Sequence, residues 1–358
     1  MTALKDRLVQ LIETDGPMPL STYMTLCLHD PQHGYYATRP GLGRDFITAP
    51  EISQIFGDLI GLWAADCWSQ IGRPAEFNLV ELGPGRGTLM ADALRATRSV
   101  DGFQNGLCLQ LIEASPALQR VQANRLSPWA PVFLPSLNDL PAAPTILIAN
   151  EYLDCLPARQ FVQSDGDWRE RVVGVDAATK QLVFGLSIDR SPEDSFPISK
   201  TDPAIDPPQS VEIQPGLDQL IETLAARAQM GAPLIALLID YGEVNPAPQD
   251  TLRAFQNGIQ IEPLEAPGES DLTVDVDFGR LKRLAQRHGL HVSGPIEQGQ
   301  FLLSLGAETH LNRLAAAAND GGQSLFEGVK RLVDPAEMGS RFKLICISNV
   351  DSFSPAGF

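Results

Sequence analysis

The sequence has few of the residues that build disulfide frameworks and metal centres. Its 358 residues include only five cysteines and five histidines. The cysteines lie far apart without a CxxC pair, and the histidines show no HExxH or other ligand spacing. We therefore expect neither a disulfide-stabilised fold nor a metal site.

Long apolar runs are also missing. No stretch reaches the roughly 20 apolar residues that a membrane-spanning helix needs. Charged residues such as Lys5, Asp6 and Arg7 interrupt the N-terminus, where a signal peptide has its apolar core. The sequence thus predicts a protein without membrane insertion and with a cytoplasmic location.

Positive charge is scarce as well. Lys and Arg number 27 against 44 Asp and Glu, which gives a formal net charge of −17. Affinity for a nucleic-acid backbone depends on clustered basic side chains, so nucleic acid is not an expected partner. The hydrophobic share of 44% is typical of a packed globular protein. The excess of acids either keeps the protein soluble or favours a basic partner.

The pattern of apolar residues changes near residue 76. Before it, apolar residues recur at helical spacing, which predicts an N-terminal helical extension over residues 1–75. After it, short continuous apolar runs alternate with turns and helices, which predicts an α/β domain over residues 76–358 with a mostly parallel sheet. The predicted helices of the extension span residues 2–14, 20–28 and 50–71. The predicted parallel strands span residues 77–82, 107–112, 131–134, 145–149 and 234–239.

Two insertions interrupt the predicted α/β domain. The first, at about residues 159–210, contains segments typical of antiparallel strands. The second, at about residues 242–277, contains four prolines and is predicted to be mostly loop. Residues 211–230 are predicted to form a helix before the last parallel strand. Additional C-terminal helices and a final apolar strand complete the predicted domain.

The strongest local signal is a glycine turn between a strand and a helix. Glu81 ends the apolar strand, and Gly83, Gly85 and Gly87 follow it before Thr88 opens the helix. Glycines at alternate positions allow a sharp turn and the close approach of a ligand. The spacing is GxGxG, whereas the dinucleotide fingerprint is GxGxxG. A carboxylate here suits a ligand with an amino group and no phosphate, as in S-adenosylmethionine. A nicotinamide cofactor and a ligand-free turn remain alternatives.

Residues after the next strands extend this cofactor hypothesis. Glu113 ends the strand at 107–112, where its carboxylate can accept hydrogen bonds from ribose hydroxyls. Asp139 and Leu140 follow the third strand and are placed by topology at the adenine edge. Asn150 ends the fourth strand and is assigned to the same cofactor site.

Two acids, Glu151 and Asp154, follow the fourth strand and are predicted to lie over the transferable methyl group. The Asn/Asp-Pro-Pro-aromatic tetrapeptide of methylases that act on base amines or glutamine is absent here, which disfavours nucleobase methylation. Alternatively, Glu151 caps the following helix and Asp154 is solvated.

Seven segments together are similar to those of one known family. They are HDPQHGYY (29–36), DFITAPEISQIFG (45–57), ELGPGRGTL (81–89), ANEYLDCLP (149–157), IDYG (239–242), DLTVDVDF (271–278) and MGSRFK (338–343). In this order they resemble the MidA family of class I S-adenosylmethionine-dependent methyltransferases, over nearly the whole chain. Three positions depart from common family residues, namely Arg44, Gly258 and its neighbours, and Asp275. These departures bear on the substrate more than on the cofactor.

The resemblance implies a Rossmann-like class I fold, with the extension at residues 1–75 packing on the cofactor site. It also implies methylation of an arginine in a partner protein, because mitochondrial members of the family modify a subunit of respiratory complex I during its assembly. A small-molecule methyltransferase and a cofactor-binding assembly factor without turnover remain alternatives, and the oligomeric state stays open.

An arginine substrate needs carboxylates to bind it, since a guanidinium is always charged. Glu151 and Asp154 are the first candidates, and Asp240 and Asp277 the second. Residues 159–277 carry 21 acids and eight basic residues, so most of the negative charge lies in and around the two insertions. We expect this charge to steer an arginine-bearing segment toward the site.

Overall fold

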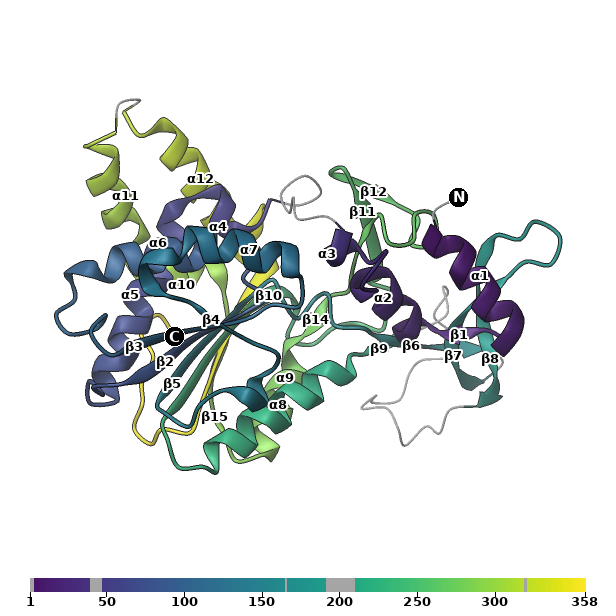
Figure 1. Ribbon diagram of the computed structural model, residues 1–358, viewed down its shortest axis with the longest axis horizontal. Helices are drawn as coiled ribbons and strands as arrows, with labels where there is room; N and C mark the ends of the chain where they lie inside the picture. The colour runs from purple at the N-terminus through teal and green to yellow at the C-terminus, as the bar shows by residue number, and fades with distance from the viewer. Residues whose placement is uncertain (1–2, 39–46, 165, 191–209, 319–320) are drawn as a thin grey trace. The chain divides into compact units, whose positions relative to one another are not determined.

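The computed structural model describes residues 3–38, 47–164, 166–190, 210–318 and 321–358 (Figure 1). The chain divides into two compact units, each built from three segments. One, here the sheet unit, comprises Ile47–Asp154, Asp218–Asn245 and Val276–Phe358. The other, here the small unit, comprises Met1–Phe46, Cys155–Leu217 and Pro246–Asp275.

The sheet unit contains the mostly parallel sheet that the apolar runs predict. Its strands are β2 (Phe77–Leu82), β3 (Leu107–Ile112), β4 (Val132–Leu134), β5 (Thr145–Asn150), β10 (Leu234–Glu243), β15 (His291–Glu297) and β16 (Phe342–Ser348). They lie in the order β15-β16-β10-β5-β2-β3-β4, and β14 (Val276–Asp277) adds to β10. Only β16 runs antiparallel to both of its neighbours. Every residue of β2 and β5 is buried, as expected for central strands covered on both faces.

Helices cover both faces of this sheet. Figure 1 shows α5, α6 and α7 on one side and α8 and α9 on the other. The helices of the unit are α4 (Ala49–Ile52), α5 (Gln54–Gln70), α6 (Thr88–Ala96), α7 (Pro116–Arg125), α8 (Pro215–Ala228), α9 (Phe278–Arg287), α10 (Gln298–Ser304), α11 (Ala307–Ala315), α12 (Gln323–Val333) and α13 (Met338–Arg341). Helices α10 and α11 confirm the predicted C-terminal helices, and α12 and α13 are additional.

The helix predicted over residues 50–71 is interrupted at Ser53. This residue has an extended backbone with φ −153° and ψ 131°, and its hydroxyl accepts a hydrogen bond from the Ile55 N–H at 3.3 Å. A serine at this position caps the new helix better than it continues the old one. The result is the single turn α4 followed by the long helix α5.

Close packing of α5 fixes the position of α6. A Cβ atom added at Gly57 would lie 2.6 Å from the Asp92 Cβ, and one added at Gly61 would lie 2.5 Å from the Ala93 Cα. The two glycines are four residues apart and therefore share one helix face. Any larger side chain there would push α6 away, and with it the turn that begins α6.

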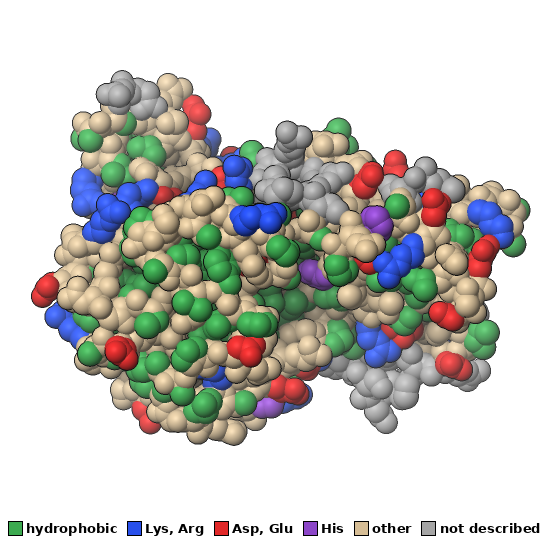
Figure 2. All heavy atoms as spheres, viewed as in Figure 1, with side chains coloured by type: hydrophobic (Ala, Val, Ile, Leu, Met, Phe, Trp, Pro, Cys, Tyr) green, Lys and Arg blue, Asp and Glu red, His purple; other side chains and the backbone are tan. Residues whose placement is uncertain are grey.

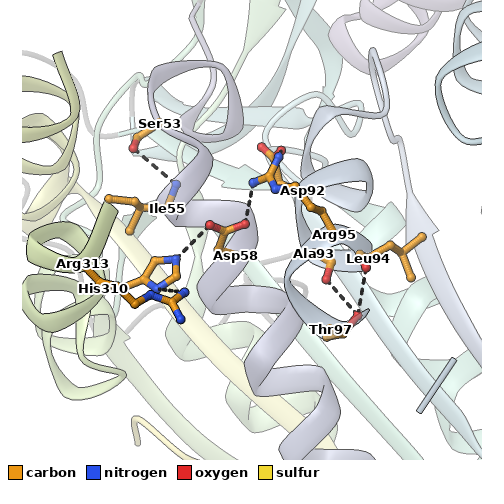
Figure 3. A network of polar contacts seen from close by, with 10 residues as sticks. All are labelled: Ser53, Ile55, Asp58, Asp92, Ala93, Leu94, Arg95, Thr97, His310 and Arg313. Carbon is orange, nitrogen blue, oxygen red and sulfur yellow. Dashed lines mark hydrogen bonds and ion pairs between the residues drawn. The ribbon is translucent and has the colours of Figure 1, made fainter. Parts of the chain in front are cut away.

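A polar network around the buried side chains of Asp58 and His310 joins α5 to α6 and α11 (Figure 3). The Asp58 carboxylate lies 2.8 Å from His310 Nε2 and accepts a hydrogen bond from Arg95 at 2.6 Å. Arg95 also pairs with Asp92 at 2.5 Å, and Arg313 contacts the other ring nitrogen of His310 at 3.1 Å. These contacts tie the C-terminal helices to the helix that follows the glycine turn. Figure 2 shows basic side chains gathered beside α11 on the face drawn.

The small unit combines helices with two antiparallel sheets. Its helices are α1 (Ala3–Asp15), α2 (Leu20–His29) and α3 (Tyr35–Thr38). The larger sheet contains β1 (Met18–Pro19), β6 (Arg159–Ser164), β7 (Asp167–Val175), β8 (Leu182–Arg190) and β9 (Ser210–Ile213). The antiparallel insertion is thus confirmed. The helix predicted over residues 211–230 is present as α8 but begins only at Pro215, because residues 211–213 belong to β9.

The second insertion differs from its prediction. It forms a three-stranded sheet of β11 (Arg253–Gln256), β12 (Ile259–Ile261) and β13 (Asp271–Thr273), where we predicted mostly loop. These strands have only three or four residues, too few for a clear alternation of apolar and polar residues in the sequence. The departures at Gly258 and Asp275 lie in and beside this sheet, and Arg44 lies outside the described residues.

The compact units divide the chain differently from the predicted boundary at residue 75. Residues 3–38 belong to the small unit, whose apolar core includes Leu4, Leu8, Tyr23 and Met24. Residues 47–75 belong to the sheet unit, where α5 packs on the sheet. Packing of the N-terminal extension on a cofactor site stays a prediction.

Candidate functional site

Several predicted site residues meet at the carboxyl edge of the parallel sheet. The strand register pairs Leu82 of β2 with Ile112 of β3 and Ala149 of β5, and it pairs Asn150 with Ile239 of β10. The residues at or directly after these strand ends are Glu81, Glu113, Asn150, Glu151 and Asp240. Ligands of open α/β sheets bind at this edge.

The glycine turn has the conformation that its sequence predicts. Gly83, Gly85 and Gly87 have φ values of 58°, 54° and 73°, in the left-handed region that favours glycine. A Cβ atom added at Gly83 would lie 2.9 Å from the Tyr152 ring, so this glycine also allows close packing. Gly87 precedes Thr88, the first residue of α6.

Two oxygen atoms beside the glycine turn are buried without a partner among the described residues. They are Glu81 Oε2 and Asn150 Oδ1. Burial, together with the nearby Glu113 carboxylate, raises the pKa of Glu81 to about 8. Unsatisfied buried acceptors are costly, so a donor from a ligand is the expected complement.

The Glu113 carboxylate is held by residues of α7. Its Oε1 atom accepts a hydrogen bond from the Ser115 N–H at 2.8 Å, and its Oε2 atom accepts one from Gln122 at 3.0 Å. Gln122 also donates to the Gly85 carbonyl at 2.8 Å and so ties Glu113 to the glycine turn. Burial raises the pKa of Glu113, and these hydrogen bonds oppose the shift.

Sequence reasoning missed Gln122. The signal was a polar residue in an apolar stripe, because Leu118, Gln122 and Leu126 are four residues apart and all are buried. A fully buried glutamine on such a face indicates a specific hydrogen-bond partner.

Glu151 adopts an unusual backbone conformation directly after β5. Its φ of 51° is rare for a residue other than glycine. Its Oε1 atom accepts hydrogen bonds from the Ala49 N–H at 2.9 Å and from Asn150 at 3.1 Å. Burial raises the pKa of Glu151 to about 7, the Asp154 charge adds to the shift, and the two hydrogen bonds oppose it. The structure thus holds this carboxylate in place beside Asp154.

Asp240 is fully buried and is held by backbone donors. Its Oδ2 atom accepts from the N–H groups of Leu153 at 2.8 Å and Asp154 at 3.1 Å, and its Oδ1 atom accepts from the Tyr241 N–H at 2.8 Å. Burial raises the pKa of Asp240, as do the nearby Asp154 and Glu151 charges, while the hydrogen bonds oppose the shift. These bonds fix the loop after β5.

Asp277 lies at the start of α9, beside the end of β10. Its carboxylate accepts a hydrogen bond from the Arg280 N–H at 2.7 Å and lies 3.9 Å from the Arg283 guanidinium. Burial raises the pKa of Asp277, although these partners oppose it. The side chain is an N-cap, the usual position for aspartate at a helix start.

Thr88 takes part in a cluster at the start of α6. Its hydroxyl donates to Glu51 of α4 and accepts from Arg125 at the end of α7. The Arg125 guanidinium also lies 4.0 Å from the Glu51 carboxylate. Three elements therefore meet at this one hydroxyl.

Asp139 and Leu140 follow β4, in and after a short 3₁₀ helix, η3 (Leu137–Asp139). Asp139 is exposed and accepts a hydrogen bond from the Ser136 hydroxyl at 2.7 Å, whereas Leu140 is buried. Arg227 of α8 donates to the Leu140 carbonyl at 2.9 Å. The loop is therefore fixed, and the hydrogen bond of Asp139 lies within this loop rather than reaching the glycine turn.

The arrangement favours a cationic ligand. Acids in or directly after β2, β3, β5 and β10 gather at one sheet edge, and burial, with a further contribution from neighbouring charges, raises the pKa values of Glu81, Glu151 and Asp240. A cation stabilises ionised carboxylates in such surroundings. Within the described residues, no group of three or more His, Cys, Asp or Glu side chains could hold a metal ion. None of the helices in that part of the chain has the length and apolar character to cross a membrane.

Comparison with known proteins gives consistent matches. A family model described as "Putative S-adenosyl-L-methionine-dependent methyltransferase" matches residues 59–296. Protein arginine methyltransferase NDUFAF7 homolog, mitochondrial, from Drosophila melanogaster is 34% identical and covers 99% of this chain and 88% of its own. Protein arginine methyltransferase NDUFAF7, mitochondrial, from Homo sapiens is 34% identical over 97% of this chain and 83% of its own.

A solved structure is similar over the same extent. The crystal structure of a protein from Burkholderia thailandensis bound to S-adenosyl-homocysteine has a TM-score of 0.82 and 25% sequence identity. The match covers 99% of this chain and 94% of that one. The two curated relatives above are named as mitochondrial proteins, so the prediction of a cytoplasmic location is wrong.

Proposed function

The chain belongs to the family of S-adenosyl-L-methionine-dependent methyltransferases, and from this premise we propose that it methylates an arginine of a partner protein. Membership confirms the resemblance to the MidA family, the class I fold and S-adenosylmethionine as the cofactor. The proposed substrate class is supported by the relatives, which are named protein arginine methyltransferases and match nearly the whole chain.

The observation that carries the proposal is the pair of acids after β5. Glu151 has a left-handed backbone, its carboxylate accepts a hydrogen bond from the Ala49 N–H, and the Asp154 charge lies close enough to raise its pKa. Both follow the central strand next to the glycine turn. Two carboxylates at this position suit a guanidinium, which offers donors in a planar fork.

The residues around the glycine turn fit the cofactor. We assign the unpartnered oxygen atoms of Glu81 and Asn150 to its ammonium group, and the Glu113 carboxylate to its ribose hydroxyls. Gly83, Gly85 and Gly87 leave the backbone accessible at the turn. S-adenosylmethionine supplies a methyl group on a sulfonium, which a nucleophile displaces in line.

The acids determine how an arginine reacts here. A guanidinium stays protonated in water and spreads its charge over three nitrogens. Glu151 and Asp154 localise that charge on one side and aim one nitrogen at the cofactor. Because the pKa of Glu151 is about 7 without a bound cation, we expect kcat/KM for the protein substrate, measured at saturating S-adenosylmethionine, to rise with pH up to about 7 and then level off.

The remaining predicted acids have supporting roles in this proposal. Asp240 receives three backbone N–H donors and fixes the loop that carries Asp154, so we assign it positioning rather than contact with arginine. Asp277 caps α9 and receives the same kind of assignment. Thr88, Asp139 and Leu140 stay proposed cofactor residues.

The target itself is a finer proposal. A subunit of respiratory complex I is the candidate partner, on the basis of the resemblance to the MidA family. A lysate experiment tests it together with the reaction. Labelled S-adenosylmethionine is added with the protein to a lysate that lacks the native enzyme. We expect a labelled protein band, and mass spectrometry of that band to locate methyl groups on arginine.

Variants separate the three possible functions. Glu151→Gln and Asp154→Asn should remove the labelled band and keep S-adenosyl-homocysteine binding, measured by calorimetry. Glu308→Gln, at an exposed glutamate in the first turn of α11, is the matched control. Label in metabolites alone would indicate a small-molecule methyltransferase. No label, with variants that still function in cells, would indicate an assembly factor without turnover.

A further inference from the structure

The single turn α4 has one backbone donor that its own turn cannot satisfy. Its Glu51 and Ile52 N–H groups both donate to the Thr48 carbonyl, at 2.9 Å and 3.2 Å. Pro50 has no N–H. Only the Ala49 N–H remains, and a buried N–H needs an acceptor.

The acceptor of this donor is Glu151. The Ala49 N–H donates to its Oε1 atom at 2.9 Å, and Ala49 itself is fully buried. Glu151 lies 102 residues further along the chain, so the bond links α4 to the loop after β5. It also fixes one oxygen of the Glu151 carboxylate, in a residue whose backbone is strained.

The other end of α4 is attached to the glycine turn. Glu51 accepts a hydrogen bond from the Thr88 hydroxyl, and Arg125 donates to the same hydroxyl. Thr88 opens α6 directly after Gly87. The four-residue turn α4 thus contacts Thr88, the residue after the glycine turn, through Glu51, and the proposed catalytic carboxylate of Glu151 through Ala49.

We propose that α4 is a positioning element for Glu151, and that Glu51 is the positioning residue that holds it on Thr88. This inference rests on the proposed role of Glu151. Loss of the Glu51 side chain releases α4 from α6, which weakens the Ala49 N–H bond and frees the Glu151 carboxylate to rotate. Coupling between the glycine turn and Glu151 follows, because both hold the same short turn.

Weakening of the Ala49 N–H bond changes the pKa of Glu151 in a definite direction. The Ala49 N–H stabilises the ionised form of Glu151 and so lowers its pKa against the effect of burial. Weakening that bond raises the pKa of Glu151. The rising limb of the kcat/KM profile therefore moves to higher pH in Glu51→Ala, by about one pH unit for the loss of one hydrogen bond to a charged group.

The conservative variant provides the rescue. Glu51→Gln keeps an oxygen that accepts from Thr88, so its pH profile and rate should stay near those of the wild type. We expect kcat of Glu51→Ala at pH 7 to fall about tenfold, because displacement of a positioned group is costly. Glu308→Ala removes a first-turn glutamate from α11 and should change neither quantity.

Hydrogen–deuterium exchange of the cofactor-free protein tests the contact without catalysis. The Ala49 amide should be protected in the wild type and in Glu51→Gln. It should exchange at least tenfold faster in Glu51→Ala and in Glu151→Ala, because each change removes or loosens its acceptor. Unfolding curves of each variant show whether faster exchange is local or global.

The outcomes separate this inference from the proposed function. Unchanged exchange and an unchanged pH profile in Glu51→Ala, with an inactive Glu151→Gln, would overturn the positioning role and leave the function intact. An active Glu151→Gln would remove Glu151 from the proposed reaction, and with it the role of α4 as an aid to catalysis. Faster exchange with a shifted limb in Glu51→Ala, and neither in Glu51→Gln, supports the inference.

Discussion

Glu81 should make the cofactor-free protein less stable as the pH rises. Its pKa is about 8 in the folded state, whereas a free glutamate has a pKa of about 4.5. Between these two values the unfolded chain releases the proton and the folded chain keeps it. The folded state therefore loses stability as pH increases through this window. The difference in pKa corresponds to about 5 kcal/mol at pH 8 and above.

The variant Glu81→Gln removes this titration while it keeps the size and a neutral polar group. Near pH 4.5 we expect its free energy of unfolding to match that of the wild type. By pH 9 the variant should be more stable, by up to about 5 kcal/mol as an upper limit, because local rearrangement reduces the cost of burying a charge. Urea unfolding without cofactor at pH 5, 7 and 9 measures this difference, with Glu308→Gln as control.

The affinity for cofactor, unlike the stability of the free protein, should increase as the pH rises. An ammonium group pairs with ionised Glu81, so wild-type affinity for S-adenosyl-homocysteine should fall about 50-fold between pH 8 and pH 6. Glu81→Gln should bind about 100-fold more weakly at pH 8 and show little dependence on pH. A variant that is no more stable at pH 9, or that binds as tightly as the wild type, would refute this reasoning.

Three further predictions follow from the same contacts. Asp58→Ala should lower the free energy of unfolding by about 2 kcal/mol in urea, because it leaves buried His310 without its acceptor and removes one of the two carboxylates that pair with Arg95 (Figure 3); a loss below about 0.5 kcal/mol would contradict this. Gln122→Ala should weaken S-adenosyl-homocysteine binding about tenfold by calorimetry, because Glu113 loses its link to the glycine turn. Unchanged affinity would exclude that role. Association with an arginine-bearing substrate, followed by stopped flow, should slow as salt increases, and a salt-independent rate would favour the solubility explanation of the acidic insertions.

The central sheet could be predicted because its strands are continuous apolar runs. β2 and β5 are buried at every position, so their sequences can be recognised as strands without knowledge of the neighbouring strands. β15 was missed because it lies at the sheet edge, is partly exposed and contains Gly294 and Pro295. The strands β11 to β13 were missed because a strand of three or four residues acquires its pattern only from pairing.

The candidate site could likewise be predicted from the sequence only in part. Chain topology places Glu81, Glu113 and Glu151 at one edge, because the carboxyl ends of parallel strands coincide there. The Ala49 N–H that donates to Glu151 lies 102 residues away, so this partner could not be assigned before α4 was placed. Gln122 lies only nine residues after Glu113, and its place in an apolar stripe indicated a buried partner without naming it.

The contrast between Glu151 and Asp240 shows where sequence reasoning ends. Both acids are at the ends of adjacent apolar strands, and the sequence, which gave Glu151 as a first candidate and Asp240 as a second, contains no information on their hydrogen-bond partners. In the structure both oxygens of Asp240 accept backbone N–H groups, from Leu153, Asp154 and Tyr241. For Glu151, the hydrogen bonds from the Ala49 N–H and from Asn150 both reach Oε1. An acid bound on both oxygens organises a loop, whereas one held through a single oxygen keeps a side from which to bind a guanidinium. Our proposal that Glu151 rather than Asp240 binds the substrate thus depends on the donors that folding brings to each carboxylate.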